Sequence, residues 1–195
     1  MENLEKLVAT FASIARPEIR QDHTAASCVA STWITVEVMR HFGVSVRPVT
    51  AKVNIYNASY VELERQLGRR PDPGTTQDGA WVVGIGFEKE RGGIGTHIVA
   101  VLDDRILVDA SIDQANDREH GIVLPGVVWT PINETFLAGL SLTCCVSGQR
   151  LTYIPSSTAL DFASLYDWGH NPQTEGAVTR IVARLEGLIA ADHHA

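Results

Sequence analysis

The stretch GTHIVAVLDDRILVDAS, residues 95–111, contains two apolar runs separated by a short charged segment. The apolar and β-branched composition of both runs predicts two β-strands that follow each other directly in the chain. His97 begins the first predicted strand and Asp109 ends the second. Whether these two side chains meet therefore depends on how the two strands pair.

The length of the connection decides which face of the sheet each side chain occupies, because successive residues of a strand point to opposite faces. A two-residue turn at Asp103–Asp104 sets Ile98 opposite Asp109 and separates His97 from Asp109. An odd connection, such as Asp103–Arg105, sets His97 and Asp109 on one face. The segment LDDRI contains no Gly or Asn, which two-residue turns of the primed types prefer. We therefore expect the odd connection.

A second stretch, HTAASCVASTWITVEVMRHFG (residues 23–43), predicts a helix with Cys28 near its start. Ser27 or Thr24 can cap this helix, and Gly43 suits its C-terminal end. The partial positive charge at a helix N-terminus lowers the pKa of a thiol, and the free backbone N–H groups there point toward bound anions.

Cys28, His97 and Asp109 together supply the residue types that nucleophilic thiol catalysis needs. The thiol needs a base within hydrogen-bond reach, and the base needs an acceptor that fixes its tautomer. Each residue also has an ordinary structural interpretation, as a small core residue, a satisfied histidine and the end of a strand. Their combination favours catalysis, with Cys28 as the nucleophile, His97 as base and acid, and Asp109 as the group that orients His97.

The segments 27–49 and 96–111 resemble the cysteine helix and the histidine strand of transglutaminase-like proteins. In that family a helix that begins at Cys leads to a Gly-Ile/Val-x-Ala/Val-Arg strand, and residues 43–47 here read GVSVR. The resemblance covers about residues 22–112 in two short blocks. It implies a papain-like α+β core, which arylamine acetyltransferases share, a Cys-His-Asp triad, and thiol acyl transfer without a metal or organic cofactor. Ile98 replaces the aromatic residue that commonly follows the histidine, and Ala110 replaces the proline after the aspartate, which leaves the substrate open.

The order of elements, helices first, then mostly strands, then a helix, favours an α+β fold in which the N-terminal helices pack on an antiparallel sheet. We expect one domain over residues 1–195. The expected helices are a first one that ends at Pro17, the Cys28 helix, one after Ser59 as N-cap, and a last one at about 174–191. The expected strands are 44–57, broken at Pro48, then 80–87, 96–103, 105–111, 129–132, 141–147 and 150–155, with a hairpin turn at Gly148-Gln149.

Composition limits the possible partners. The chain has 195 residues, of which 45% are hydrophobic and 20% charged, with a net charge of −7. It has no basic stripe for nucleic acid and no apolar run near the ~18 residues that span a membrane. The N-terminal residues lack the pattern of a signal peptide, so we expect a cytoplasmic protein. Three cysteines, two of them adjacent, suit neither a disulfide framework nor a zinc site.

Five further polar or aromatic residues are weaker candidates. Gln21 could donate to an oxyanion and Trp168 could line a substrate cleft, although a solvated loop and a packing role explain them as well. His23 could be a second acid or base. Asp113 and Asp117 lack the spacing of a calcium loop, so we expect a solvated helix start there.

We therefore expect a cysteine hydrolase, an amidase or thiol protease, that acts on a peptide, a protein or a small amide or thioester. Two alternatives stay open. An acyltransferase passes the acyl group to an amine rather than to water, as in transglutaminases and acetyltransferases. A binding or structural protein on the same fold has no active site.

Overall fold

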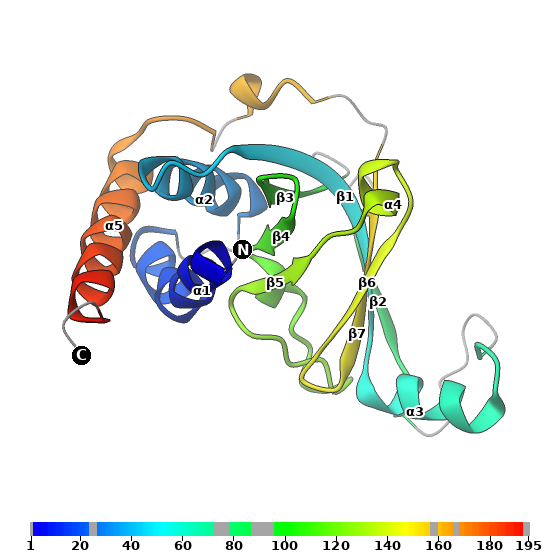
Figure 1. Cartoon of the computed structure of the whole chain (residues 1–195). Coiled ribbons are helices and arrows are strands. Elements are labelled where there is room, and N and C mark those ends of the chain that lie inside the picture. Colours follow the sequence, from blue (N-terminus) through cyan, green and yellow to red (C-terminus); the bar gives the residue numbers. More distant parts are fainter. Residues whose placement is uncertain are drawn as a thin grey trace.

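A computed structural model of the chain describes residues 2–23, 27–71, 79–86, 96–156, 160–165 and 168–192. Its secondary structure is mixed, with α-helices and a sheet in which every pair of neighbouring strands is antiparallel. The long first strand bends, so that the sheet curls toward a barrel (Figure 1). The α+β class expected from the sequence is confirmed.

Three long helices gather on one side of the molecule, and the sheet forms the other side (Figure 1). The second of them also packs on strands β1 and β3, which are bounded below. No helix in the described part of the chain is long and apolar enough to cross a membrane. The helices are α1 (Glu2–Asp22), α2 (Cys28–His41) and α5 (Pro172–Asp192) on the helical side, with α3 (Ala58–Leu67) and α4 (Glu134–Leu137) at the sheet.

The sheet contains seven described strands in the order β5-β4-β3-β1-β7-β6, and β2 pairs with the second half of β1. On one side of β1, the first half of the strand pairs with β3 and the second half pairs with β2. The strands are β1 (Val46–Tyr56), β2 (Val82–Ile85), β3 (His97–Leu102), β4 (Ile106–Asp109), β5 (Val128–Pro131), β6 (Leu142–Val146) and β7 (Gln149–Pro155).

Helix α1 continues past Pro17, where the sequence predicted its end. Proline lacks an amide hydrogen and usually disrupts a helix interior. Tertiary contacts hold the following turn: Ile19 is fully buried, and Glu18 accepts hydrogen bonds from Arg180 (3.0 Å) and Arg184 (2.6 Å) of α5. The predicted end was wrong because it considered only the local backbone.

Strand β1 likewise runs through Pro48 without a break. Pro48 pairs with Ala100 of β3, whereas β7 pairs with β1 only from Ala51 onward. Proline is tolerated where a strand has a neighbour on one side only, because no second ladder needs its missing amide hydrogen. The predicted break was wrong for this reason.

Two predicted local signals are displaced by one or two residues. The N-cap of α3 is Asn57 rather than Ser59, and its side chain accepts from the backbone N–H of Tyr60 (2.8 Å). The β6–β7 turn is formed by Ser147 and Gly148, both with positive φ, because Val146 pairs with Gln149.

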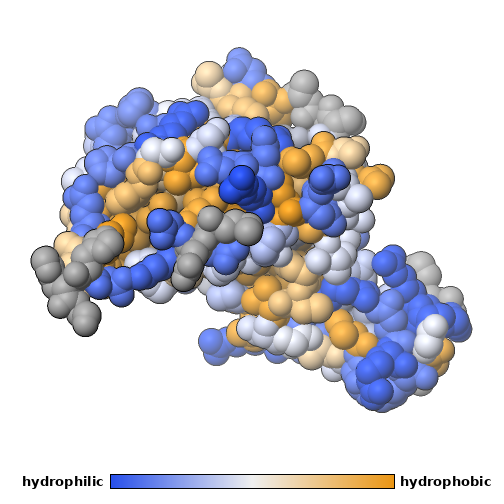
Figure 2. Space-filling model, in the orientation of Figure 1, coloured by the Kyte–Doolittle hydropathy of each residue, from blue (hydrophilic) through white to orange (hydrophobic). Residues whose placement is uncertain are grey.

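The sheet separates two groups of buried apolar residues. On β3, Ala100 and Leu102 pack with the helices, whereas Val99 and Val101 belong to the group enclosed by the curled sheet. This alternation is the pattern of a strand covered on both faces. In Figure 2, hydrophobic residues lie between the helices and along the strands, and hydrophilic residues cover the projecting end around α3.

Two leucines of α5 test which face of the helix stabilises the fold. Leu185 is fully buried and Leu188 is 46% exposed. Leu185→Ala should lower the free energy of unfolding by about 2–5 kcal/mol, because it leaves a cavity. Leu188→Ala should lower it by less than about 1 kcal/mol. Urea denaturation measures both, and equal losses would contradict this packing of α5.

Candidate functional site

The connection between β3 and β4 has three residues, Asp103 to Arg105, because Leu102 pairs with Ile106. The odd connection expected from the sequence is confirmed. The turn chemistry differs from the expectation, since Asp103 and Asp104 both adopt positive φ, the conformation of a primed turn. Aspartate tolerates this left-handed region better than most residues do, and Arg105 supplies the extra residue.

The register brings His97 and Asp109 together on one face. The His97 Nε2–H donates to Asp109 Oδ2 at 2.8 Å. Both residues are buried, with exposed fractions of 0% and 1%. A buried carboxylate is tolerated only when it is paired and hydrogen-bonded, so this contact is a structural requirement as well as a possible chemical one.

Asp109 receives further hydrogen bonds from two other residues. Oδ1 accepts from the backbone N–H of Ser111 (3.1 Å) and from its hydroxyl (3.4 Å). The hydroxyl of Tyr153, on β7, donates to Oδ2 at 3.3 Å. Burial and the charge of Asp109 raise the pKa of Tyr153 well above its usual value, so Tyr153 keeps the proton that it donates. Each oxygen of Asp109 therefore has at least one donor.

Cys28 is the first residue of α2, and Ser27 caps the helix by accepting from the backbone N–H of Ala30 (3.2 Å). This confirms Ser27 as the cap, whereas Thr24 lies outside the described residues. Thr32, one turn further along the same face, donates its hydroxyl to the Ile98 carbonyl at 2.9 Å. That bond ties the start of α2 to the start of β3.

The Cys28 thiol lies close enough to the His97 ring to contribute to the raised pKa of the imidazole. The Nε2 atom of His97 faces Asp109, so Nδ1 is the ring nitrogen left for the thiol. Cys28 is half-buried whereas His97 and Asp109 are buried, so Cys28 is the most exposed residue of the three.

The surroundings of His97 favour its protonated form. Burial lowers the pKa of the imidazole, but the charge and hydrogen bond of Asp109 and the contact with Cys28 outweigh it and raise the pKa to about 10. A histidine held in this way gives a nearby thiolate a positive partner at neutral pH.

Gln114 also reaches this ring. It belongs to a short 3₁₀ helix, η2 (Ile112–Ala115), that follows β4, and its Nε2 atom lies 3.1 Å from His97 Nδ1. Gln114 is exposed. Gln114 therefore contacts the ring nitrogen that does not face Asp109.

The weaker candidates lie in other surroundings. Gln21 is exposed and donates to Glu18 at 2.8 Å, within the network that joins α1 to α5. Trp168 is half-buried against the helical core, with its ring 5.1 Å from that of Phe162. The Nε2 atom of His23 is buried and has no hydrogen-bond partner among the residues that the structure describes.

The expectation that Asp113 is a solvated residue is wrong. Asp113 is 8% exposed and accepts from Arg16 Nε at 3.0 Å, and Arg20 forms a second ion pair with it. Both arginines come from α1, far away in the sequence, so no local pattern could predict this burial. Asp117 pairs with the ring of His120 at 2.6 Å.

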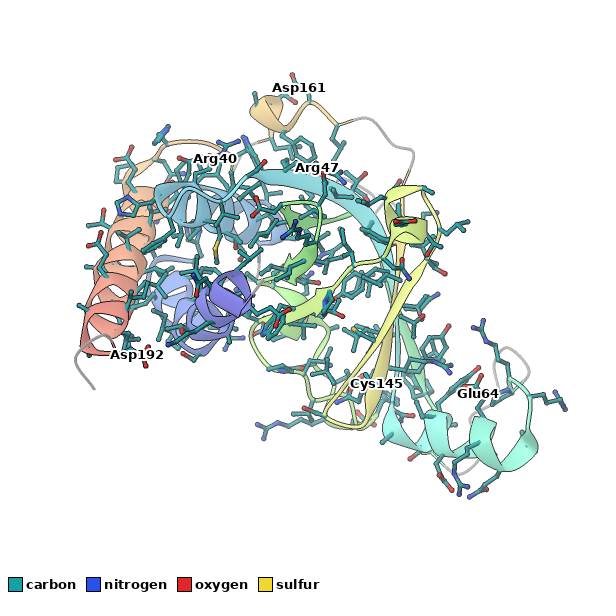
Figure 3. The ribbon with its side chains drawn as sticks, viewed as in Figure 1. Arg40, Arg47, Glu64, Cys145, Asp161 and Asp192 are labelled. Carbon is teal, nitrogen blue, oxygen red and sulfur yellow. The ribbon has the colours of Figure 1, made fainter. Side chains whose placement is uncertain are left out.

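The other two thiols lie on β6. Cys145 is exposed and lies toward the α3 end of the sheet, well apart from α2 (Figure 3). Cys144 is half-buried, and burial together with the charges of Cys145 and Asp109 raises its pKa to about 11. In the described segments, no group of three or more His, Cys, Asp and Glu side chains is arranged to hold a metal ion.

The sequence analysis missed Tyr153, Ser111 and Gln114. Ser111 could have been found as a hydroxyl two residues after Asp109. Tyr153 and Gln114 reach the site through the curl of the sheet and the turn of η2, which have no local signature. Comparison of the chain with known families, curated proteins and solved structures gives no match.

The raised pKa of His97 predicts a pH-dependent stability. Protonation of His97 adds to the free energy of unfolding. This stabilisation is complete below pH 6.5, the ordinary pKa of histidine, and it is lost as the pH rises toward the folded-state pKa of about 10. The free energy of unfolding should therefore decline over this interval. Asp109→Asn removes the charge that raises the pKa, so the decline should be smaller in that variant. Urea denaturation at pH 6, 8 and 10 measures it, and parallel declines in both proteins would contradict the assignment.

Proposed function

We propose that this protein is a cysteine acyl-transfer enzyme that hydrolyses an amide or peptide bond. The observation that carries the proposal is the chain of contacts from the half-buried Cys28 at a helix start, through His97, to the buried Asp109. These contacts have the order that thiol catalysis needs: nucleophile, base and orienting acceptor. The resemblance to transglutaminase-like proteins at the same three residues agrees with it.

The first half of the reaction forms a thioester. The Cys28 proton passes to Nδ1 of His97, and the sulfur attacks the substrate carbonyl carbon. The carbonyl oxygen becomes an oxyanion, to which the backbone N–H at the first helical position can donate. The tetrahedral intermediate then expels the amine, which takes the proton from His97.

The second half releases the acyl group. Water gives a proton to His97 and attacks the thioester carbon, and the Cys28 sulfur leaves and recovers the proton. The products are a carboxylic acid and the amine of the first half. An amine in place of water would make the protein a transferase, and product analysis with and without added amine distinguishes the two. Asp109 keeps the His97 ring oriented throughout and takes no proton.

Selective alkylation tests the nucleophile. Iodoacetamide at pH 6 should modify Cys28 much faster than Cys144 or Cys145, because a thiol beside imidazolium at a helix N-terminus is the more reactive nucleophile. Peptide mass spectrometry after timed quenching gives the rate at each cysteine. His97→Gln should reduce the rate at Cys28 to that of the exposed Cys145.

The same measurement contains its control. Cys145→Ser should not change labelling of Cys28, because Cys145 lies away from α2 (Figure 3). Faster labelling of Cys145 than of Cys28, or a rate at Cys28 that does not depend on His97, would favour a binding or structural protein on this fold.

Acylation by p-nitrophenyl acetate tests the chemistry before a natural substrate is known. The protein should release one equivalent of nitrophenolate in a burst and gain one acetyl group at Cys28. Cys28→Ala should abolish the burst. Asp109→Asn should keep the fold and slow the burst by up to about ten-thousandfold, as seen when the orienting aspartate of a triad is changed. An unchanged burst in Cys28→Ala would refute the nucleophile.

A further inference from the structure

The amide of Gln114 approaches the ring nitrogen of His97 that the proposed reaction assigns to Cys28. Gln114 Nε2 lies 3.1 Å from His97 Nδ1, and the other ring nitrogen is occupied by Asp109 at 2.8 Å. Nδ1 is therefore the nitrogen through which the proposed proton exchange between Cys28 and His97 would run. A ring nitrogen makes one good hydrogen bond, as acceptor when it is unprotonated and as donor when it is protonated. Cys28 and Gln114 cannot both have it.

The competition exists in either protonation state of the ring. When Nδ1 is unprotonated, the Gln114 N–H and the Cys28 S–H are rival donors. When Nδ1 carries a proton, the carboxamide can turn so that its oxygen faces the ring, and this oxygen and the thiolate are rival acceptors. In both states a hydrogen bond between His97 and Gln114 excludes one between His97 and Cys28.

The backbone beneath Gln114 is fixed although the side chain is exposed. Its neighbour Ile112 is fully buried, and Asp113 is held by Arg16 and Arg20 of α1. The backbone N–H of Gln114 donates to the Ser111 carbonyl at 3.1 Å. The carboxamide therefore approaches a fully buried ring from a rigid support on the exposed side of the site.

We propose that Gln114 is a positioning residue that competes with Cys28 for Nδ1 of His97 and thereby restrains the reactivity of the thiol. The inference rests on the proposed function, because it concerns the same Cys28–His97 pair. With Gln114 in place, the Cys28 thiol of the free enzyme is less reactive than Cys28, His97 and Asp109 alone would make it.

Charged and titratable groups around the pair do not provide the same competition. Asp109 of β4 binds the opposite nitrogen of the ring, and Tyr153 of β7 binds Asp109. Raised pKa values keep Tyr153 and Cys144 neutral at pH 5–8. Asp113, beside Gln114, is ion-paired with Arg16 and Arg20 of α1.

The experiment measures alkylation of Cys28 by iodoacetamide from pH 5 to pH 9 in the full chain. Gln114→Ala removes the carboxamide, and Gln114→Met keeps a side chain of similar length that excludes water from Nδ1. Both should alkylate Cys28 about ten- to hundredfold faster than the wild type at pH 6, the effect of one hydrogen bond that involves a charged group. Gln66→Ala is the matched control, because Gln66 is an exposed glutamine of α3 that donates to Glu62.

The pH profile separates restraint from simple loosening. With restraint, the low-pH limb of the profile moves to lower pH in both Gln114 variants. If Gln114 only supports the local structure, its loss lowers the rate at pH 6 and the profile approaches that of a free thiol, which rises near pH 8.5. Unchanged or slower alkylation in both variants, with the wild type still dependent on His97, overturns this inference alone. A wild-type rate that does not depend on His97 overturns the proposed function as well.

Discussion

The need to satisfy one buried carboxylate organises this end of the sheet. Asp109 is 1% exposed, and a charge with so little water around it must be paired and hydrogen-bonded. Its donors come from separate parts of the chain: His97 at the start of β3, Ser111 after β4, and Tyr153 on β7. The carboxylate therefore joins strands that are not neighbours in the sheet, because β1 lies between β3 and β7.

The parts that could be predicted from sequence are those decided by local geometry. The side-chain period of a strand and the absence of Gly and Asn between the two apolar runs were enough to expect an odd connection and neighbouring His97 and Asp109. The Ser27 cap and Gly43 gave the bounds of the Cys28 helix for a similar reason, since caps act within one turn. The prediction reached the right register although the turn itself adopts positive φ at Asp103 and Asp104.

The parts that could not be predicted depend on contacts between distant segments. Pro17 does not end α1, because α5 holds Glu18 in the following turn. Pro48 does not break β1, because β7 begins its pairing only at Ala51. Asp113 is buried because α1 presents Arg16 to it. Local sequence propensities contain no information about any of these contacts.

The two nitrogens of His97 are used for different purposes. Nε2 faces Asp109, a buried acceptor that fixes the ring and favours its protonated form. Nδ1 faces the side of the exposed Gln114, whose amide lies 3.1 Å from it. Asp109 increases the affinity of the ring for a second proton, which then resides on Nδ1, and burial of the ring opposes this effect. A neighbour at Nδ1 that can either donate or accept pairs with the ring in both protonation states and leaves the orientation set at Nε2 unchanged. An amide is suited to this position because it carries both functions and no charge.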